Sequence, residues 1–91
     1  MASAEGKFTL GAIDILAGAR QALQDAGHPA AAYLYRHQYE TPDERIGPDA
    51  VVSSFALPTG VVLFIITDAA RIHTVVMTAA DARPDPSASP P

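Results

Sequence analysis

The sequence predicts an α+β domain in which two short helices pack on one face of an antiparallel sheet of three or four strands. Two observations indicate this class. Three apolar runs between residues 50 and 78 are separated by two short turns, which is the pattern of a meander of strands. The segment before them carries apolar residues at helical spacing. Helices there would cover the apolar side of the meander, so the predicted order is one strand, two helices and three strands.

The first third of the chain fits two interpretations. Apolar residues between 12 and 26 recur at helical spacing, so one long amphipathic helix would satisfy the pattern. Within residues 8–15, however, apolar side chains alternate as in a strand, and Gly11 could host a bulge where the phase slips. Both cannot hold. We predict an edge strand at residues 8–15 and a short helix at residues 17–26, ended by Gly27.

A second helix is predicted at residues 30–38. Pro29 suits the first turn of a helix, and the residues after it are good helix formers. The helix must end before Pro42. Residues 40–49 contain two prolines, a glycine and several charges, a composition typical of a loop.

The rest of the domain is predicted to be the meander. Residues 51–57 alternate with the period of a strand, and residues 58–60 read Pro-Thr-Gly, a turn. Residues 61–66 are an unbroken run of Val, Leu, Phe and Ile, which predicts a central strand with both faces covered. Residues 68–71 make a second turn. Residues 72–78 form a mostly β-branched third strand.

Length and composition indicate one small domain. The 91 residues are 48% hydrophobic and carry a formal net charge of -4. We predict a disordered N-terminus at residues 1–6, a single domain at residues 7–80 and a disordered, proline-rich tail at residues 81–91. A domain of this size buries only about 60% of its unfolded surface, so self-association as a homodimer would add stability.

Several classes of function are disfavoured by composition. The chain has no cysteine, which excludes a disulfide framework and a thiolate metal site. Its histidines, His28, His37 and His73, have no ligand spacing, so we predict no metal and no cofactor. The negative charge disfavours nucleic acid as a partner. No apolar run approaches the ~20 residues of a membrane helix, so we expect no membrane partner and a cytoplasmic protein.

Two short polar clusters are candidate catalytic sites. Arg36 and His37 close the second predicted helix, while Arg71 and His73 begin the last strand. A metal-independent ribonuclease needs an acid or base that titrates near neutral pH and an arginine beside the scissile phosphate. His37, Arg71 and His73 are therefore the catalytic candidates. In the structural alternative, the first cluster binds the last carbonyls of its helix and Arg71 pairs with Asp68.

A third candidate is an interaction surface on the second helix. Tyr35, Arg36 and Tyr39 could form the rim of a protein interface, where tyrosine and arginine are enriched. The competing interpretation is ordinary packing of these side chains against the domain.

Five segments carry a resemblance to known proteins: Phe8-Thr9-Leu10-Gly11, Ala22-Leu23 with Ala26-Gly27, Leu34-Tyr35-Arg36-His37, Val52-Ser53-Ser54-Phe55, and the stretch from Phe64 to Arg71. In this order they resemble a family of small bacterial proteins of plasmids, phages and other mobile elements, described as plasmid-related or hypothetical. The family follows its Arg-His pair with Gly-Asp-Trp-Gly, where this chain has Tyr39 to Pro42, and it has an acid where this chain has Ala70. The resemblance implies a mobile-element protein and no particular activity.

The predicted element order is also similar to that of RelE- and ParE-type toxins and of barnase-like ribonucleases, a likeness at the level of the fold. Our first hypothesis is a small non-enzymatic accessory protein of a bacterial mobile element that binds a protein partner or itself. The alternative is a RelE- or barnase-like ribonuclease or toxin, and a weaker one is a DNA-associated regulator. An enzyme would gather its arginines and histidines in one cleft, whereas an interaction module would disperse them and expose an apolar sheet face or edge.

Overall fold

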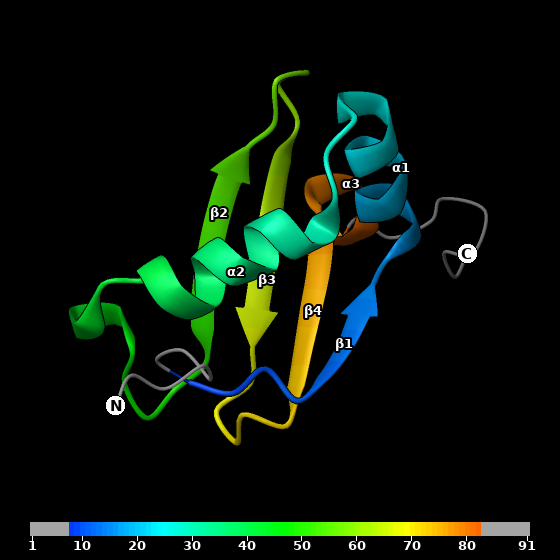
Figure 1. Ribbon diagram of the computed structural model, residues 1–91. Coiled ribbons are helices and arrows are strands. Elements are labelled where there is room, and N and C mark those ends of the chain that lie inside the picture. The colour runs from blue at the N-terminus through cyan, green and yellow to red at the C-terminus, as the bar shows by residue number, and fades with distance from the viewer. Residues whose placement is uncertain (1–7, 83–91) are drawn as a thin grey trace, which may run out of the picture.

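The computed structural model describes residues 8–82 and contains a four-stranded sheet with helices packed against it (Figure 1). This confirms the α+β class. The elements are β1 (Ala12–Ile15), α1 (Ala17–Ala26), α2 (Ala30–Glu40), the 3-10 turn η1 (Asp43–Arg45), β2 (Val51–Ala56), β3 (Val62–Thr67), β4 (His73–Thr78) and α3 (Ala79–Ala82).

The strands lie in the order β1-β4-β3-β2. β2, β3 and β4 form the expected antiparallel meander, in which Ser53 lies opposite Ile65 and Ile65 opposite Val76. β1 runs parallel to β4, with Ile15 opposite Val76. The sheet is therefore mixed, and the prediction of an antiparallel sheet throughout is wrong for this edge. Alternation of apolar side chains indicates a strand, but it does not show whether a neighbouring strand about 60 residues away runs parallel or antiparallel to it.

The N-terminal strand is shorter than predicted, while the helix after it has the predicted bounds. Residues 8–11 precede β1 as irregular chain. Gly11 has φ +67°, and its Cα passes against the backbone of Ile72, which explains why the strand starts only at Ala12. The amide of Ala12 donates to the Ile72 carbonyl at 3.0 Å. The alternative of one long helix over residues 12–26 is thus wrong.

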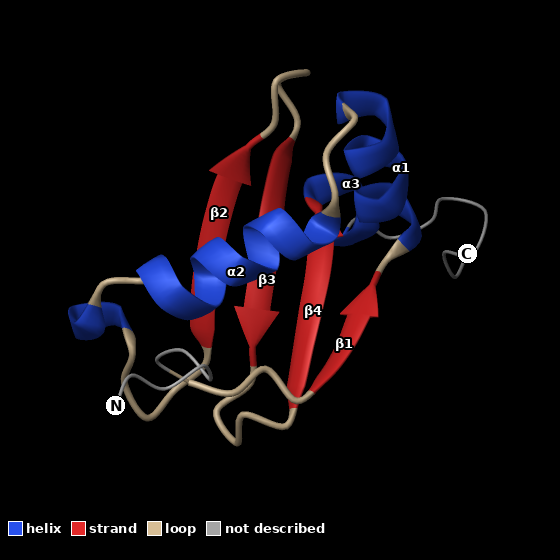
Figure 2. Cartoon of the chain, viewed as in Figure 1, coloured by secondary structure: helices blue, strands red, loops and turns tan. Residues whose placement is uncertain are grey.

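Both helices lie on one face of the sheet, and Figure 2 shows α2 crossing in front of β2 and β3. Gly27 ends α1 as predicted, because its φ of 70° lets its amide donate to the Gln24 and Leu23 carbonyls. α2 continues two residues beyond the predicted end, to Glu40. The core between helices and sheet is formed by Ala19, Ala22, Leu23, Tyr33, Leu57, Leu63, Ile65 and Val76.

The opposite face of the sheet carries apolar side chains that α1 and α2 do not cover. We call this surface the open face; its apolar residues are Val52, Val62, Phe64, Ile66, Val75 and Met77. Val62 is 41% exposed and Val52 49% exposed, while Leu63 and Ile65 on the helical side are fully buried. The prediction that residues 61–66 are covered on both faces is therefore wrong, because an unbroken apolar run does not report whether a second layer exists.

The described chain extends through α3, beyond the predicted domain end at residue 80. The Asp81 carboxylate accepts the backbone amide of Gly18 at 2.7 Å and that of Thr78 at 2.9 Å, so Asp81 belongs to the folded domain. The predicted disordered tail, residues 81–91, thus begins too early, because residues 81 and 82 belong to α3. The rest of that tail and the N-terminal segment at residues 1–6, also predicted to be disordered, lie outside the described residues. Between residues 8 and 82, no helix is long and apolar enough to cross a membrane.

Candidate functional site

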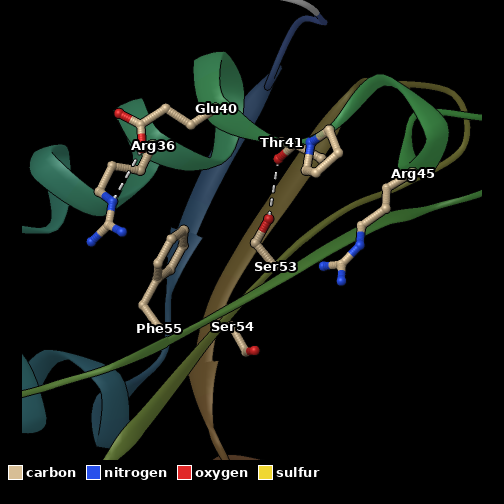
Figure 3. Close-up of a pocket in the computed structure, with 8 residues that line it drawn as sticks. Arg36, Glu40, Thr41, Arg45, Ser53, Ser54 and Phe55 are labelled. Carbon is tan, nitrogen blue, oxygen red and sulfur yellow. Dashed lines mark hydrogen bonds and ion pairs between the residues drawn. The ribbon is translucent and has the colours of Figure 1, made fainter.

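A pocket of about 150 Å³ lies where the C-terminal end of α2 meets the edge strand β2 (Figure 3). Its walls come from α2, the turn after it and β2. The lining residues are Arg36, Glu40, Thr41, Pro42, Arg45, Ser53, Ser54 and Phe55. Arg36 and Glu40 lie on the C-terminal half of α2. Pro42 and η1 follow the helix and bring Arg45 to the same pocket.

Two arginines lie on either side of Ser53 in this pocket (Figure 3). The Arg36 guanidinium lies 4.8 Å from the centre of the Phe55 ring, and its Nε is 3.5 Å from the Glu40 carboxylate. The two terminal nitrogens of Arg36 have no partner among the described side chains. The Arg45 guanidinium likewise makes no hydrogen bond or ion pair with any described side chain. The pocket therefore offers guanidinium donors with spare hydrogen-bonding capacity.

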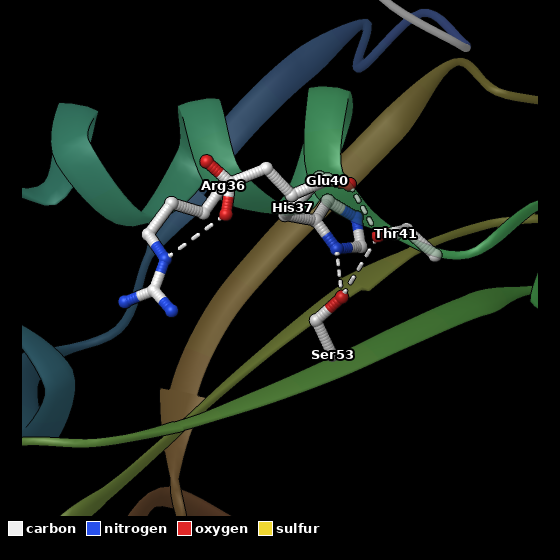
Figure 4. Close-up of polar contacts among 5 residues, drawn as sticks. All are labelled: Arg36, His37, Glu40, Thr41 and Ser53. Atoms are coloured by element: carbon white, nitrogen blue, oxygen red, sulfur yellow. Dashed lines mark hydrogen bonds and ion pairs between the residues drawn. The ribbon is translucent and has the colours of Figure 1, made fainter.

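A chain of buried hydrogen bonds lies beneath the pocket, centred on His37. Figure 4 shows one end of it, where His37 and Thr41 meet Ser53. His37 is fully buried, with Nδ1 2.6 Å from the Ser53 hydroxyl and Nε2 2.8 Å from the Thr67 hydroxyl. Thr67 is 2.8 Å from the Thr74 hydroxyl, which donates to the Leu10 carbonyl at 2.7 Å. The chain joins α2 to three strands and to the segment before β1.

The bond from Thr74 to the Leu10 carbonyl fixes which atom donates in each bond back to His37 Nε2. Because Thr74 gives its only proton to a carbonyl, Thr67 must donate to Thr74, and His37 Nε2–H must donate to Thr67. Burial lowers the pKa of His37 from 6.5 to about 4, so the ring is neutral near pH 7. Since Nε2 carries the proton of the neutral ring, Nδ1 accepts the hydrogen bond from the Ser53 hydroxyl.

This environment makes His37 a poor general base. The imidazolium form is disfavoured by burial, and the two partners of the ring are hydroxyls of Ser53 and Thr67, where a catalytic triad would place a carboxylate. The ring also has no exposed surface on which to meet a substrate. The arrangement is suited to fixing α2 on the sheet and to shaping the floor of the pocket through Ser53.

The predicted catalytic residues do not share a cleft. His37 contacts the Phe8 ring edge to face at 5.0 Å, and the Arg71 guanidinium lies 5.7 Å from the centre of the same ring. The two residues therefore meet Phe8 rather than each other. His73 lies exposed on β4, on the side of the open face. Arg36 lies in the pocket at the edge of β2.

Arg71 holds the loop before β2 against the turn before β4. Its guanidinium donates to the carbonyls of Gly47 at 2.6 Å and of Asp49 and Asp68 at 2.9 Å. The predicted pairing with Asp68 is thus made through the backbone, since the Asp68 carboxylate instead accepts the amides of Ile72 and His73. Arg71 also has a φ of 61°, which is uncommon for a side-chain-bearing residue.

The interaction candidates on α2 point in two directions. Tyr35 is 57% exposed and stacks on Tyr39 with ring centres 4.4 Å apart, whereas Arg36 belongs to the pocket. Sequence reasoning missed Arg45, Phe55 and the pocket role of Ser53. No local pattern marks these residues, because they meet only when α2 crosses β2.

The three histidines are in three different places. His28 lies 2.6 Å from the Tyr33 hydroxyl through Nδ1, His37 is in the buried chain, and His73 is at the start of β4. Within the described part of the chain, no three histidine, aspartate or glutamate side chains are grouped in a way that could hold a metal ion.

Comparison with known proteins adds no relative to this description: no protein family, no curated protein and no solved structure matches the chain.

Proposed function

We propose that this protein is a small non-enzymatic accessory protein that acts by binding another protein or a second copy of itself through the open face. The observation that carries the proposal is the uncovered apolar surface on the side of the sheet opposite α1 and α2. In register, Val52, Ile66 and Val75 form one row across three strands, and Phe64 and Met77 form the next. Val52 and Val62 are exposed and the other four apolar residues of this face are half-buried. Neighbouring apolar side chains that remain accessible in one patch are typical of interaction sites.

The energy available from this face is modest. Complete burial of a Val, Ile, Phe or Met side chain contributes roughly 1.5–3 kcal/mol, and several of these side chains are already partly covered by their neighbours. Six of them would contribute on the order of 6 kcal/mol, near the low end of the 4–15 kcal/mol cost of association. The face therefore supports reversible binding that polar contacts at its border must strengthen.

The dispersal of Arg36, His37, Arg71 and His73 supports the same proposal over a ribonuclease. The resemblance to plasmid-related proteins supports a bacterial mobile element as the setting.

The proposal is tested by capture of the tagged protein from a bacterial extract, with and without RNase, together with sedimentation velocity of the pure protein. The variant is the double change Val52→Lys and Val62→Lys. The control is Ile72→Lys, because Ile72 is 67% exposed in a turn outside the open face. We expect a protein partner or a self-associated species that resists RNase, is lost in the double variant and persists in the control.

Recovery of RNA or ribosomes alone, lost on RNase treatment, would contradict the proposal. It would favour the ribonuclease alternative, with His37, Arg71 and His73 as the residues to replace.

A further inference from the structure

The outer edge of β2 has backbone donors and acceptors that no described strand pairs with. The amide of Leu57 donates to Val61 at 2.8 Å, which marks this as a hydrogen-bonded pair of the antiparallel ladder. Because hydrogen-bonded residues alternate along an antiparallel strand, Phe55, Ser53 and Val51 also bond to β3. The N–H and C=O groups of the residues between them, Val52, Ser54 and Ala56, point away from β3. β2 is the last strand in the sheet order, so these groups have no ladder partner among the described residues.

The pocket with the two arginines opens at this same edge. The side chains of Ser53 and Phe55 lie on the helical side of β2, where they line the pocket. The side chains of Val52 and Ser54 lie on the open face, because successive residues of a strand point to opposite faces. The charged residues that line the pocket are two arginines and Glu40, an excess of one positive charge in a chain whose net charge is -4. A strand edge without a ladder partner among the described residues, bordered by two guanidinium groups with spare hydrogen-bonding capacity, is complementary to an extended chain that carries carboxylates.

We propose that the edge of β2 binds an extended segment of a partner protein in which acidic and apolar residues alternate. The segment adds a fifth strand to the sheet. Its carboxylates lie on the helical side, where Arg36 and Arg45 bind them, and its apolar side chains lie on the other side, where they continue the open face. This inference rests on the proposed function, since it names the chemistry of the partner and the contacts that strengthen a modest apolar interface.

A second copy of the chain fits this edge poorly. β2 contains no acidic residue, so pairing of two β2 edges would bring the arginines of both copies together without a carboxylate from the added strand. β1 contains Asp14, but Asp14 lies in register with Val75 on the open face. In a continuous sheet with the helices of both copies on the same side, Asp14 would therefore fall on the side away from Arg36 and Arg45.

The test uses synthetic ten-residue peptides labelled with fluorescein, with binding measured by fluorescence anisotropy. The probe alternates Asp and Val. The matched peptides alternate Lys and Val, or carry the same five Asp and five Val residues in two blocks. A fourth peptide is the probe with N-methyl groups on the backbone nitrogens that would donate to β2. We expect binding of the probe alone, because only it has both the alternation and the backbone donors.

The protein variants separate this site from a general charge effect. Arg45→Glu is expected to weaken binding of the probe at least tenfold. Arg20→Glu makes the same charge change on α1, where the exposed guanidinium donates to the Ile15 carbonyl, and is expected to change binding less than twofold.

Equal binding of the blocked or N-methylated peptide would overturn the inference, as would unchanged binding by Arg45→Glu. A dimer joined through β2 that excludes the probe would overturn it as well. Failure here is distinct from failure of the proposed function, because partner capture that still depends on Val52 and Val62 would leave the open face as the interaction site.

Discussion

The Ser53 hydroxyl donates a hydrogen bond of 2.6 Å to Nδ1 of the fully buried His37, and this contact joins the edge strand β2 to the last turn of α2. Ser53 also lines the pocket that contains Arg36 and Arg45. The buried polar chain and the candidate binding surface therefore share one residue. Changes to His37 are expected to alter the stability of the fold and the position of the pocket floor together.

Replacement of His37 by alanine is expected to destabilise the protein by about 2–4 kcal/mol. The change leaves a cavity in a fully buried site and removes hydrogen bonds to Ser53 and Thr67. Urea denaturation followed by circular dichroism measures the loss. His37→Gln keeps a donor and an acceptor and should cost less. A loss below about 0.5 kcal/mol in His37→Ala would show that the buried chain contributes little.

Stability is expected to fall as the pH is lowered from about 6.5 to about 4. Burial lowers the pKa of His37 from 6.5 to about 4, so the unfolded chain binds a proton in this range that the folded chain does not. The largest effect is about 3 kcal/mol, from a pKa difference of about 2.5 units at 1.36 kcal/mol each. Denaturation at a series of pH values tests this. In His37→Gln, the free energy of unfolding should depend less on pH between about 4 and 6.5. If the pH dependence is unchanged in this variant, groups other than His37 cause it.

Alanine at Gly18 is expected to destabilise the protein although alanine is the better helix former. Its Cβ would lie 2.6 Å from Oδ1 of Asp81, the atom that accepts the Gly18 amide. The carboxylate would have to move and lose that bond, at a cost of about 1–2 kcal/mol.

A double-mutant cycle isolates this effect. Asp81→Ala alone also removes the bonds from Thr78, and it should destabilise the protein. In the Asp81→Ala background, Gly18→Ala should become neutral or stabilising by up to about 1 kcal/mol, because only the helix propensity remains. Additive losses in the double variant would contradict the contact as the cause.

Gly11 and Gly27 form a matched pair for separating backbone strain from steric overlap. Their φ values are +67° and +70°, but a Cβ on Gly11 would lie 2.2 Å from the Ile72 carbonyl carbon, whereas one on Gly27 meets nothing within 4 Å. Gly27→Ala should cost about 1 kcal/mol from the left-handed conformation alone. Gly11→Ala should cost at least about 2 kcal/mol more. Similar losses in thermal denaturation would mean that the β1 segment shifts freely away from Ile72.

Much of the fold is predictable because its signals are local. The meander follows from alternation and two turns, and the bounds of α1 follow from apolar spacing and the glycine that ends it. The parallel pairing of β1 with β4 has no local signal, since it depends on contacts between residues about 60 positions apart. The exposure of Val62 was also beyond prediction, because an apolar run does not report whether a second layer covers it.

The site was less predictable than the fold. Residue type alone makes His37 a catalytic candidate. In the structure its ring is buried and neutral, and it is hydrogen-bonded between the hydroxyls of Ser53 and Thr67. The role of Arg36 at an interaction surface stays a prediction; the structure shows that Arg36 lines the pocket. The pocket position of Arg45 could not be predicted, because nothing in the sequence of a charged loop shows which strand edge lies beside it.

The pairing of β1 with β4 also dictates when the domain can be completed during synthesis. The first strand emerges from the ribosome about 60 residues ahead of β4, the described strand with which it pairs. The Gly18 amide in α1 can bond to Asp81 only later still. Until then α1 and β1 have little to pack against, and their apolar side chains remain available to other chains. A nascent chain that stops before β4 would therefore contain a hairpin and two helices without the strand that joins them.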